Sequence, residues 1–314
     1  MKSSSLKSNP LFVCTLLASL GLVGCAHSSK SATAAVAGLR PNLESMKPAE
    51  VKGPVTLRLK AEMGRTESVS YTHRSVAKAF EDQTLRHEKE EGLDFVSKAE
   101  TLKVGTPDAK AVSVFTQSLS IVKKDGVGDL HDFAMPELDE KLEVTADSLG
   151  KILKSGDYPP ESVFYVSPIS LPENPVSVGD TWTMEASWLS LEEMIPYQLQ
   201  MVSILKGFWQ CGTGTTADTC AEIEISGDVG FQGPLTKAMN FKSSWKGRIF
   251  FALNAGTVLW SRTDSEERLI AERVRRDVDS CLEAVLIAPE SLALQGLKGA
   301  RCEKVPKAET QTAP

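Results

Sequence analysis

The chain lacks the short motifs that mark common catalytic sites. It contains no Gly-x-Ser-x-Gly nucleophile elbow and no His-Glu-x-x-His metal motif. Its four histidines, at positions 27, 73, 87 and 131, have neither triad nor metal-ligand spacing. Paired Cys-x-x-Cys motifs are missing as well, which argues against a zinc site. The sequence therefore predicts a non-catalytic protein without a metal or other cofactor.

Neighbouring carboxylates do not change that interpretation. Glu185, Glu192 and Glu193 are close enough in the sequence to suggest an acid–base pair. Acidic residues of this kind are nearly always solvated at the surface. His131 is followed directly by Asp132, and adjacent side chains on a strand point apart. We therefore predict no catalytic residues.

The chain also lacks a clustered basic face. It has 35 basic and 41 acidic residues and a net charge of −6, which argues against nucleic-acid binding. Hydrophobic residues make up 41% of the chain, far more than in a disordered protein. No internal repeat or long coiled coil is present, and the length suits one large β domain or two smaller ones.

One apolar run stands out near the N-terminus. Residues 11–22 are mostly apolar, follow the basic residues Lys2 and Lys7, and lead into Leu22-Val23-Gly24-Cys25. The run is too short to span a bilayer, which takes about 18 residues or more. It fits the core of a secretory signal, which has ~7–15 residues. This stretch resembles a bacterial lipoprotein signal peptide with its lipobox.

The lipobox resemblance implies a membrane anchor. In such lipoproteins the leader is cut before the cysteine, whose thiol carries a diacylglyceryl group and whose new amine is acylated. The resemblance thus implies that Cys25 is lipidated, and two or more acyl chains hold a protein stably at a membrane. Ala26 stands where an Asp favours inner-membrane retention in the family, which indicates the outer membrane. We expect a periplasmic or surface-facing domain whose membrane contact is this anchor.

The remaining cysteines predict disulfides. Two of the six belong to the leader and the anchor, which leaves an even number in an exported chain. Four cysteines allow three pairings, and we expect the local ones, Cys211–Cys220 and Cys281–Cys302. These bonds close loops of about 10 and 22 residues, worth roughly 2.7 and 3.4 kcal/mol in the chain-entropy model.

Alternation of apolar and polar residues predicts strands along most of the chain. The expected strands are 55–61, 69–73, 93–104, 112–126, 142–146, 151–153, 181–188, 196–208, 219–230, 241–253 and 256–263. Asp125-Gly126 ends one strand and is a strong signal for a hairpin turn. Residues 158–175 contain several prolines and predict a long loop.

Two stretches are ambiguous. Residues 76–91 fit neither period well, and the run from Glu88 looks solvated. Residues 264–287 fit both periods, because Val274 and Val278 belong to a helical spacing with Ile270 and to a strand face with Leu282. We favour one long strand over a helix, since it continues the meander. Residues 292–297 predict a short helix held back by Cys302.

The pattern as a whole predicts an all-β protein. We expect an antiparallel meander whose sheet curls or closes partly, like a half-barrel, with at most short helices. The expected organisation is a signal peptide at 1–24, a lipidated flexible tether at 25–50, a β-rich globular domain at 51–288, and a C-terminal segment with a polar tail at 289–314.

The most distinctive internal stretch is LPENPVSVGDTW, residues 171–182. It is similar to the LP…PV.VGD.W approach to a strand found in many bacterial lipoproteins. Gly179 suits a tight turn with positive φ, and Asp180 can bond its own backbone. Trp182 is expected to enter the core. A resemblance to the peptidoglycan-binding LysM module stops after Gly179-Asp180-Thr181, because the module's aromatic opening and helix are missing.

A tethered meander of long strands also resembles the half-barrel lipoprotein carriers, whose curved sheet shelters acyl chains. The resemblance implies that aromatic side chains line a groove, while the alternative is that they are ordinary core residues. The aromatic residues concerned are Trp209, Trp245, Phe251 and Trp260.

Three functions remain open. The first is a non-catalytic lipoprotein domain that contacts envelope proteins or lipid. The alternative is a binding or carrier module for a lipid or another hydrophobic ligand. The second alternative is a hydrolase of envelope polymers. The sequence predicts no particular ligand-binding residues.

Overall fold

The computed structural model describes residues 46–190, 195–211, 218–232, 239–289 and 302. They form one sheet of eleven antiparallel strands, with the two short 3-10 helices η3 (His131–Phe133) and η4 (Val163–Tyr165). The strands are β1 (Thr66–Glu81), β2 (Thr84–Val104), β3 (Val114–Gly126), β4 (Lys141–Asp147), β5 (Ile152–Ser155), β6 (Thr181–Leu189), β7 (Pro196–Cys211), β8 (Asp218–Phe231), β9 (Met239–Ala252), β10 (Thr257–Ala271) and β11 (Val274–Ala288). The all-β prediction is confirmed.

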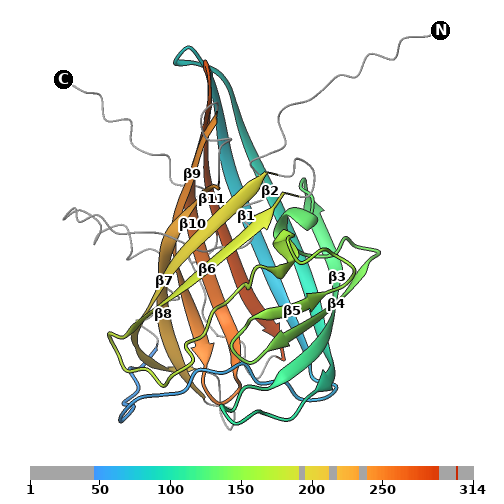
Figure 1. Ribbon diagram of the computed structural model, residues 1–314, viewed down its shortest axis with the longest axis vertical. Helices are drawn as coiled ribbons and strands as arrows, with labels where there is room; N and C mark the ends of the chain where they lie inside the picture. The colour runs from blue at the N-terminus through green and yellow to red at the C-terminus, as the bar shows by residue number, and fades with distance from the viewer. Residues whose placement is uncertain (1–45, 191–194, 212–217, 233–238, 290–301, 303–314) are drawn as a thin grey trace.

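The sheet consists of two meanders joined through their first and last strands. Strands β1 to β5 follow one another toward one edge, β6 to β11 return from the other edge, and β1 pairs with β11 in the middle. The long strands curve around an inner face (Figure 1). The edge strands β5 and β6 do not pair with each other. The expectation of a curved sheet with few helices is therefore also confirmed.

The long loop between β5 and β6 connects the two edges of the sheet. Ser162 in this loop forms an isolated parallel bridge with Leu189 of β6, and Leu171 N donates to Leu149 O at 2.9 Å. Val163 and Phe164 of the loop are buried in the main core. The loop thus covers the inner face where the two edge strands leave it uncovered.

The main core lies on the inner face, because alternate residues of each strand point to it. The register places Phe251 of β9 opposite Ala221 of β8, and Ile249 opposite Ile223. All four are almost fully buried. A smaller cluster on the outer face contains Phe250 and Trp260. No helix among the described residues is long and apolar enough to cross a membrane.

Both expected disulfides are confirmed. Cys211 ends β7 and is bonded to Cys220 near the start of β8, so the bond closes the end of that hairpin. Cys281 of β11 is bonded to Cys302. The short helix expected at 292–297 lies outside the described residues.

The expected strand at 55–61 is wrong. Only Val55 forms a bridge, to Val176, and the rest of the segment pairs with no strand. Its alternation has another cause: Leu57 is fully buried in the core, while Arg58 Nη1 donates to Pro172 O at 2.7 Å. Alternate burial along an irregular segment imitates the pattern of a strand.

The tight turn expected at Asp125-Gly126 is also wrong. Residues 127–140, including η3, separate β3 from β4. Gly126 has a φ of 97°, and a Cβ there would lie 2.1 Å from Gly92 O. The glycine therefore serves a close approach between β3 and β2, and the chain does not reverse there.

The two ambiguous stretches each contain a hairpin turn. Asp82 and Gln83 connect β1 to β2 with φ values of 47° and 68°, as two-residue hairpin turns require. Glu272 and Arg273 connect β10 to β11, so residues 264–287 form parts of two strands and not one. The strand preference is correct, but the single long strand is not. Both turns lack the glycine that signals such turns in a sequence.

Candidate ligand-binding groove

The groove begins where β7 extends beyond β6. Thr181, the first residue of β6, lies opposite Ile204, whereas β7 continues to Cys211. The N-terminal segment takes the place of β6 along this extension. Ala49 N donates to Phe208 O at 2.9 Å, and an isolated bridge joins Pro48 to Trp209. Backbone groups of β7 that β6 leaves unpaired are thereby satisfied.

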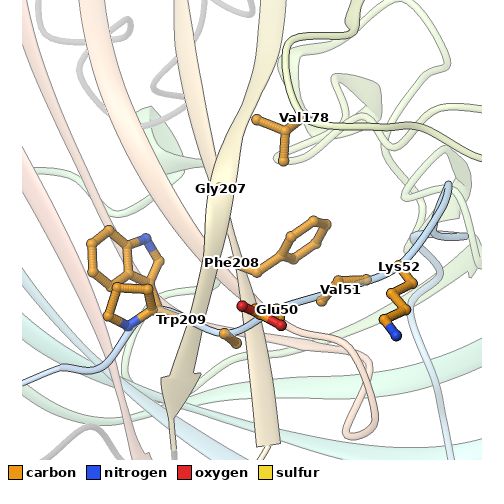
Figure 2. Close-up of a pocket in the computed structure, with 9 residues that line it drawn as sticks. Glu50, Val51, Lys52, Val178, Gly207, Phe208 and Trp209 are labelled. Atoms are coloured by element: carbon orange, nitrogen blue, oxygen red, sulfur yellow. The ribbon is translucent and has the colours of Figure 1, made fainter.

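A cavity of about 510 Å³ lies at this junction (Figure 2). Its lining comes from three segments and consists of Pro48, Ala49, Glu50, Val51, Lys52, Val178, Gly207, Phe208 and Trp209. Most of the lining is apolar, and the cavity size lies within the roughly 300–1,000 Å³ of small-molecule sites. The groove thus has the size and the largely apolar lining of a small-molecule site.

Strand β7 forms the back wall of the groove. Phe208 and Trp209 point to opposite sides of the strand, as Figure 2 shows. Gly207 has no side chain, and a Cβ there would meet no atom within 4 Å. The glycine thus leaves open space on the side of β7 that carries Trp209.

The motif at residues 171–182 positions the wall of the groove that lies opposite β7. Gly179 has a φ of 94° and donates its N–H to Leu205 O at 2.8 Å, while Asp180 Oδ2 accepts from Ser177 N at 2.7 Å. The predicted tight turn is confirmed. It leaves Val178 56% exposed at the groove.

Trp182, at the end of the motif, packs against the main core, as expected, and remains partly exposed. Its Nε1 donates to Ser170 O at 2.8 Å.

A buried ionic network fixes the Trp209 ring on the outer face. Trp209 Nε1 donates to Glu222 Oε2 at 2.9 Å, and Glu222 also pairs with Arg248. Arg248 Nη2 lies 3.4 Å from Glu224 Oε2. Removing one member of such a network leaves a buried charge unpaired, which is strongly destabilising. The network therefore holds one side of the groove rigid.

Only one of the four expected aromatic residues lines the groove. Trp209 does so, whereas Trp245, Phe251 and Trp260 are buried in the core clusters. The core alternative therefore applies to those three. Trp260 Nε1 donates to Glu283 Oε1 at 2.8 Å, which satisfies its buried polar atom.

The three histidines that the structure describes lie in different environments. His73 is buried, and burial lowers its pKa to about 4, so it is neutral at physiological pH. His131 Nε2 lies 2.9 Å from Glu140 Oε2 near the surface, and His87 is exposed. Within the described part of the chain, no group of three or more His, Cys, Asp or Glu side chains could hold a metal ion.

Several sequence-level candidates cannot be placed. Cys25, His27, Glu192 and Glu193 lie outside the described residues, while Glu185 is exposed on β6. The sequence analysis missed the role of residues 48–52, which it assigned partly to the tether. Their only signal was Ala49 and Val51 after Pro48, which is too short to predict pairing with a strand so distant in the chain.

Comparison with known proteins identifies no family. No family model and no curated protein matches the chain. Among solved structures, it is similar to lipovitellin, from work on lipid–protein interactions, with a TM-score of 0.36 and 12% identity over 72% of this chain. The chain spans only 25% of that lipovitellin chain.

Two further structures are more distant in geometry. One is DynF from the dynemicin biosynthesis pathway of Micromonospora chersina, with a TM-score of 0.21 and 7% identity over 78% of this chain and 94% of that one. The other is an outer membrane channel from Pseudomonas putida F1, with a TM-score of 0.22 and 10% identity over 76% of this chain and all of that one. Likenesses this weak carry no functional argument, so the function must be argued from the site.

Proposed function

We propose that this protein is an exported, lipid-anchored binding module that holds an acyl chain in the groove beside β7. The observation that carries the proposal is the cavity of about 510 Å³ whose walls are formed by Val51, Val178 and Phe208. Apolar walls favour a hydrocarbon, because they cannot compensate the lost hydration of a polar ligand. Glu50 and Lys52 add one charge of each sign to the lining.

The proposed anchor supports an acyl chain as the occupant. Residues 48–52, which line the groove, include the end of the tether expected at 25–50. If residues 25–46 form the expected flexible tether, their root-mean-square end-to-end distance is roughly 25 Å. Acylation of Cys25 would therefore hold the groove at a typical distance of about this size from the bilayer, where acyl chains are abundant.

The groove is tested by filling it. Val178 and Val122 are 56% and 57% exposed, but only Val178 lines the groove. We expect Val178→Trp to weaken binding of dansylundecanoic acid at least about tenfold, and Val122→Trp to change it less than about twofold. Fluorescence titration of the purified protein measures both. Equal binding by the two variants, or no binding by the wild type, would contradict the proposal.

The anchor is tested separately. Cys25→Ser should abolish metabolic labelling with palmitate and release the protein from membranes. Labelling that persists in the variant would rule out lipidation at this residue. Because the groove titration uses purified protein, failure of the anchor leaves the groove result valid.

A second candidate is contact with an envelope protein, and the projecting hairpins favour it. β3 pairs with β2 only as far as Leu93, and Gly92 O accepts from Val127 N at 3.2 Å. Beyond this point, Thr84–Glu91 of β2 has no partner strand on that side among the described residues, at the projecting end of the sheet (Figure 1). Such edges can accept a partner strand, although the charges on this one oppose non-specific pairing. A photo-crosslinker at Leu85 should capture a protein in cells, and the same group at Val122 should not.

A further inference from the structure

A polar patch interrupts the apolar inner face near the projecting end of the sheet. Ser280 of β11 lies opposite Ser75 of β1 and Ser265 of β10, and the Oγ atoms of Ser265 and Ser280 are 2.6 Å apart. The next row toward the hairpin tips contains Glu267 of β10 opposite Ser243 of β9. Both face the main core: Ser243 lies between the core residues Phe241 and Trp245 on β9, and Glu267 lies opposite the core residue Val278.

Glu267 and Ser243 have no hydrogen-bond partner among the described residues. Glu267 is 3% exposed and Ser243 is 1% exposed. Both carboxyl oxygens of Glu267 and the Oγ of Ser243 are unpaired. Residues directly opposite on antiparallel strands have Cβ atoms about 4.5–5.5 Å apart. Two unsatisfied polar groups therefore lie side by side in the interior, which native proteins rarely tolerate.

The chemistry of these groups limits what can satisfy them. Burial raises the pKa of Glu267 to about 8, opposed only in part by the charge of Arg276, so the carboxyl is protonated at neutral pH. A protonated carboxyl and a serine hydroxyl can each donate and accept one hydrogen bond. Their complement is an uncharged group that also donates and accepts, such as an alcohol. An ion would meet a largely apolar environment that penalises charge.

The surroundings suit an apolar body attached to that group. Phe241 and Trp245 flank Ser243 on the same face of β9, and Val278 lies opposite Glu267 on β11. One row closer to the hairpin tip, Leu269 and Arg276 lie opposite each other and are partly exposed. A ligand would therefore enter from the projecting end, past Leu269.

We infer that Glu267 and Ser243 form the polar end of a second ligand site, which binds a long-chain alcohol or a similar uncharged hydroxyl-bearing amphiphile on the inner face of the sheet. The hydroxyl of the ligand exchanges hydrogen bonds with both side chains. Its hydrocarbon chain packs against Phe241, Trp245 and Val278. This site is separate from the groove beside β7, since Glu267 lies near the opposite end of the strands.

The probe is dodecanol, with dodecane as the matched molecule that lacks the hydroxyl. We expect dodecanol to bind the wild-type chain and Glu267→Gln with similar affinity, because a carboxamide also donates and accepts. We expect at least about tenfold weaker binding by Ser243→Ala and Glu267→Leu. Dodecane should not distinguish the four proteins. Isothermal titration calorimetry measures the affinities, and circular dichroism confirms that each variant is folded.

Two results would overturn the inference. One is undiminished dodecanol binding when Ser243→Ala, which removes a single oxygen and is the variant least prone to misfold, is added to folded Val178→Trp, in which the groove is filled. The other is no dodecanol binding by the wild type, which would indicate that buried water alone satisfies the pair. Val178→Trp should leave dodecanol binding at this site unchanged. Failure of the groove and failure of the Glu267 site are thereby distinguishable.

Discussion

Replacing Glu267 with Gln should change how the stability of this protein depends on pH. The ordinary pKa of a glutamate is 4.5, and burial raises that of Glu267 to about 8. Between these pH values the folded protein keeps a proton that the unfolded chain has lost. Stability therefore falls as the pH rises toward 8, by up to about 1.4 kcal/mol per pH unit.

A second buried group, His73, determines the pH range in which the effect of Glu267 can be measured. Burial lowers the pKa of His73 from 6.5 to about 4, so the unfolded chain takes up a proton below pH 6.5 that the folded protein refuses. This lowers stability as the pH falls, which opposes the contribution of Glu267 in the acid range. Between pH 6.5 and 8 the unfolded His73 goes from half protonated to nearly neutral, so its contribution is small and Glu267 dominates the comparison.

The expected magnitude follows from the two pKa values of Glu267. From pH 6.5 to 8 the wild type should lose roughly 1.5 kcal/mol of unfolding free energy through this group. Glu267→Gln cannot ionise and should lack this loss, whereas Glu266→Gln, on the exposed neighbour, should retain it. Urea unfolding at a series of pH values measures the three slopes. Identical slopes for wild type and Glu267→Gln would refute the reasoning that this carboxyl is buried and protonated.

Two further predictions concern the frame of the sheet. Replacing both Cys211 and Cys220 with Ala should lower the unfolding free energy, measured by urea unfolding, by roughly 2.7 kcal/mol. An unchanged value would contradict the idea that this bond restricts the unfolded chain. Gly150 and Gly179 have similar φ values, 93° and 94°. A Cβ at Gly150 would lie 2.2 Å from Ile169 O, whereas a Cβ at Gly179 would meet no atom within 4 Å. Gly179→Ala should therefore cost about 1–2 kcal/mol, and Gly150→Ala clearly more. Equal losses in thermal or urea unfolding would show that the contact with Ile169 relaxes easily.

The strands were predictable because each has one face on the core. Tyr71 and His73 of β1, for example, pack against Phe95 and Phe133, and their alternation with polar residues is visible in the sequence. The turn at Glu272-Arg273 was not predictable, because both residues favour regular structure over turns and nothing interrupts the apolar pattern. Periodicity reports which side of the chain is buried, and it does not report where the chain reverses.

The two candidate sites could not be predicted from the sequence, each for a different reason. The groove joins Pro48 to Trp209, and no local pattern reveals a contact between segments so distant in sequence. Glu267 belongs to the charged run Ser265-Glu266-Glu267-Arg268, which looks solvated. Its burial depends on the register between β9, β10 and β11, which a single sequence does not specify. Only the disulfides could be paired correctly from spacing alone.

The two proposed sites lie toward opposite ends of the long strands. We therefore expect them to take their ligands from different sources. Glu267 is ten residue steps along β10 from Thr257, at the groove end, which corresponds to roughly 33 Å of extended chain. This exceeds the root-mean-square end-to-end distance of roughly 25 Å expected of a flexible coil between Cys25 and Met46. An anchor at Cys25 would therefore hold the groove near the bilayer, while the Glu267 site could remain in the aqueous phase. Shortening the tether should then leave dodecanol binding unaltered and change only the exchange of acyl chains with vesicles. A tether deletion that weakened both to the same extent would contradict this division.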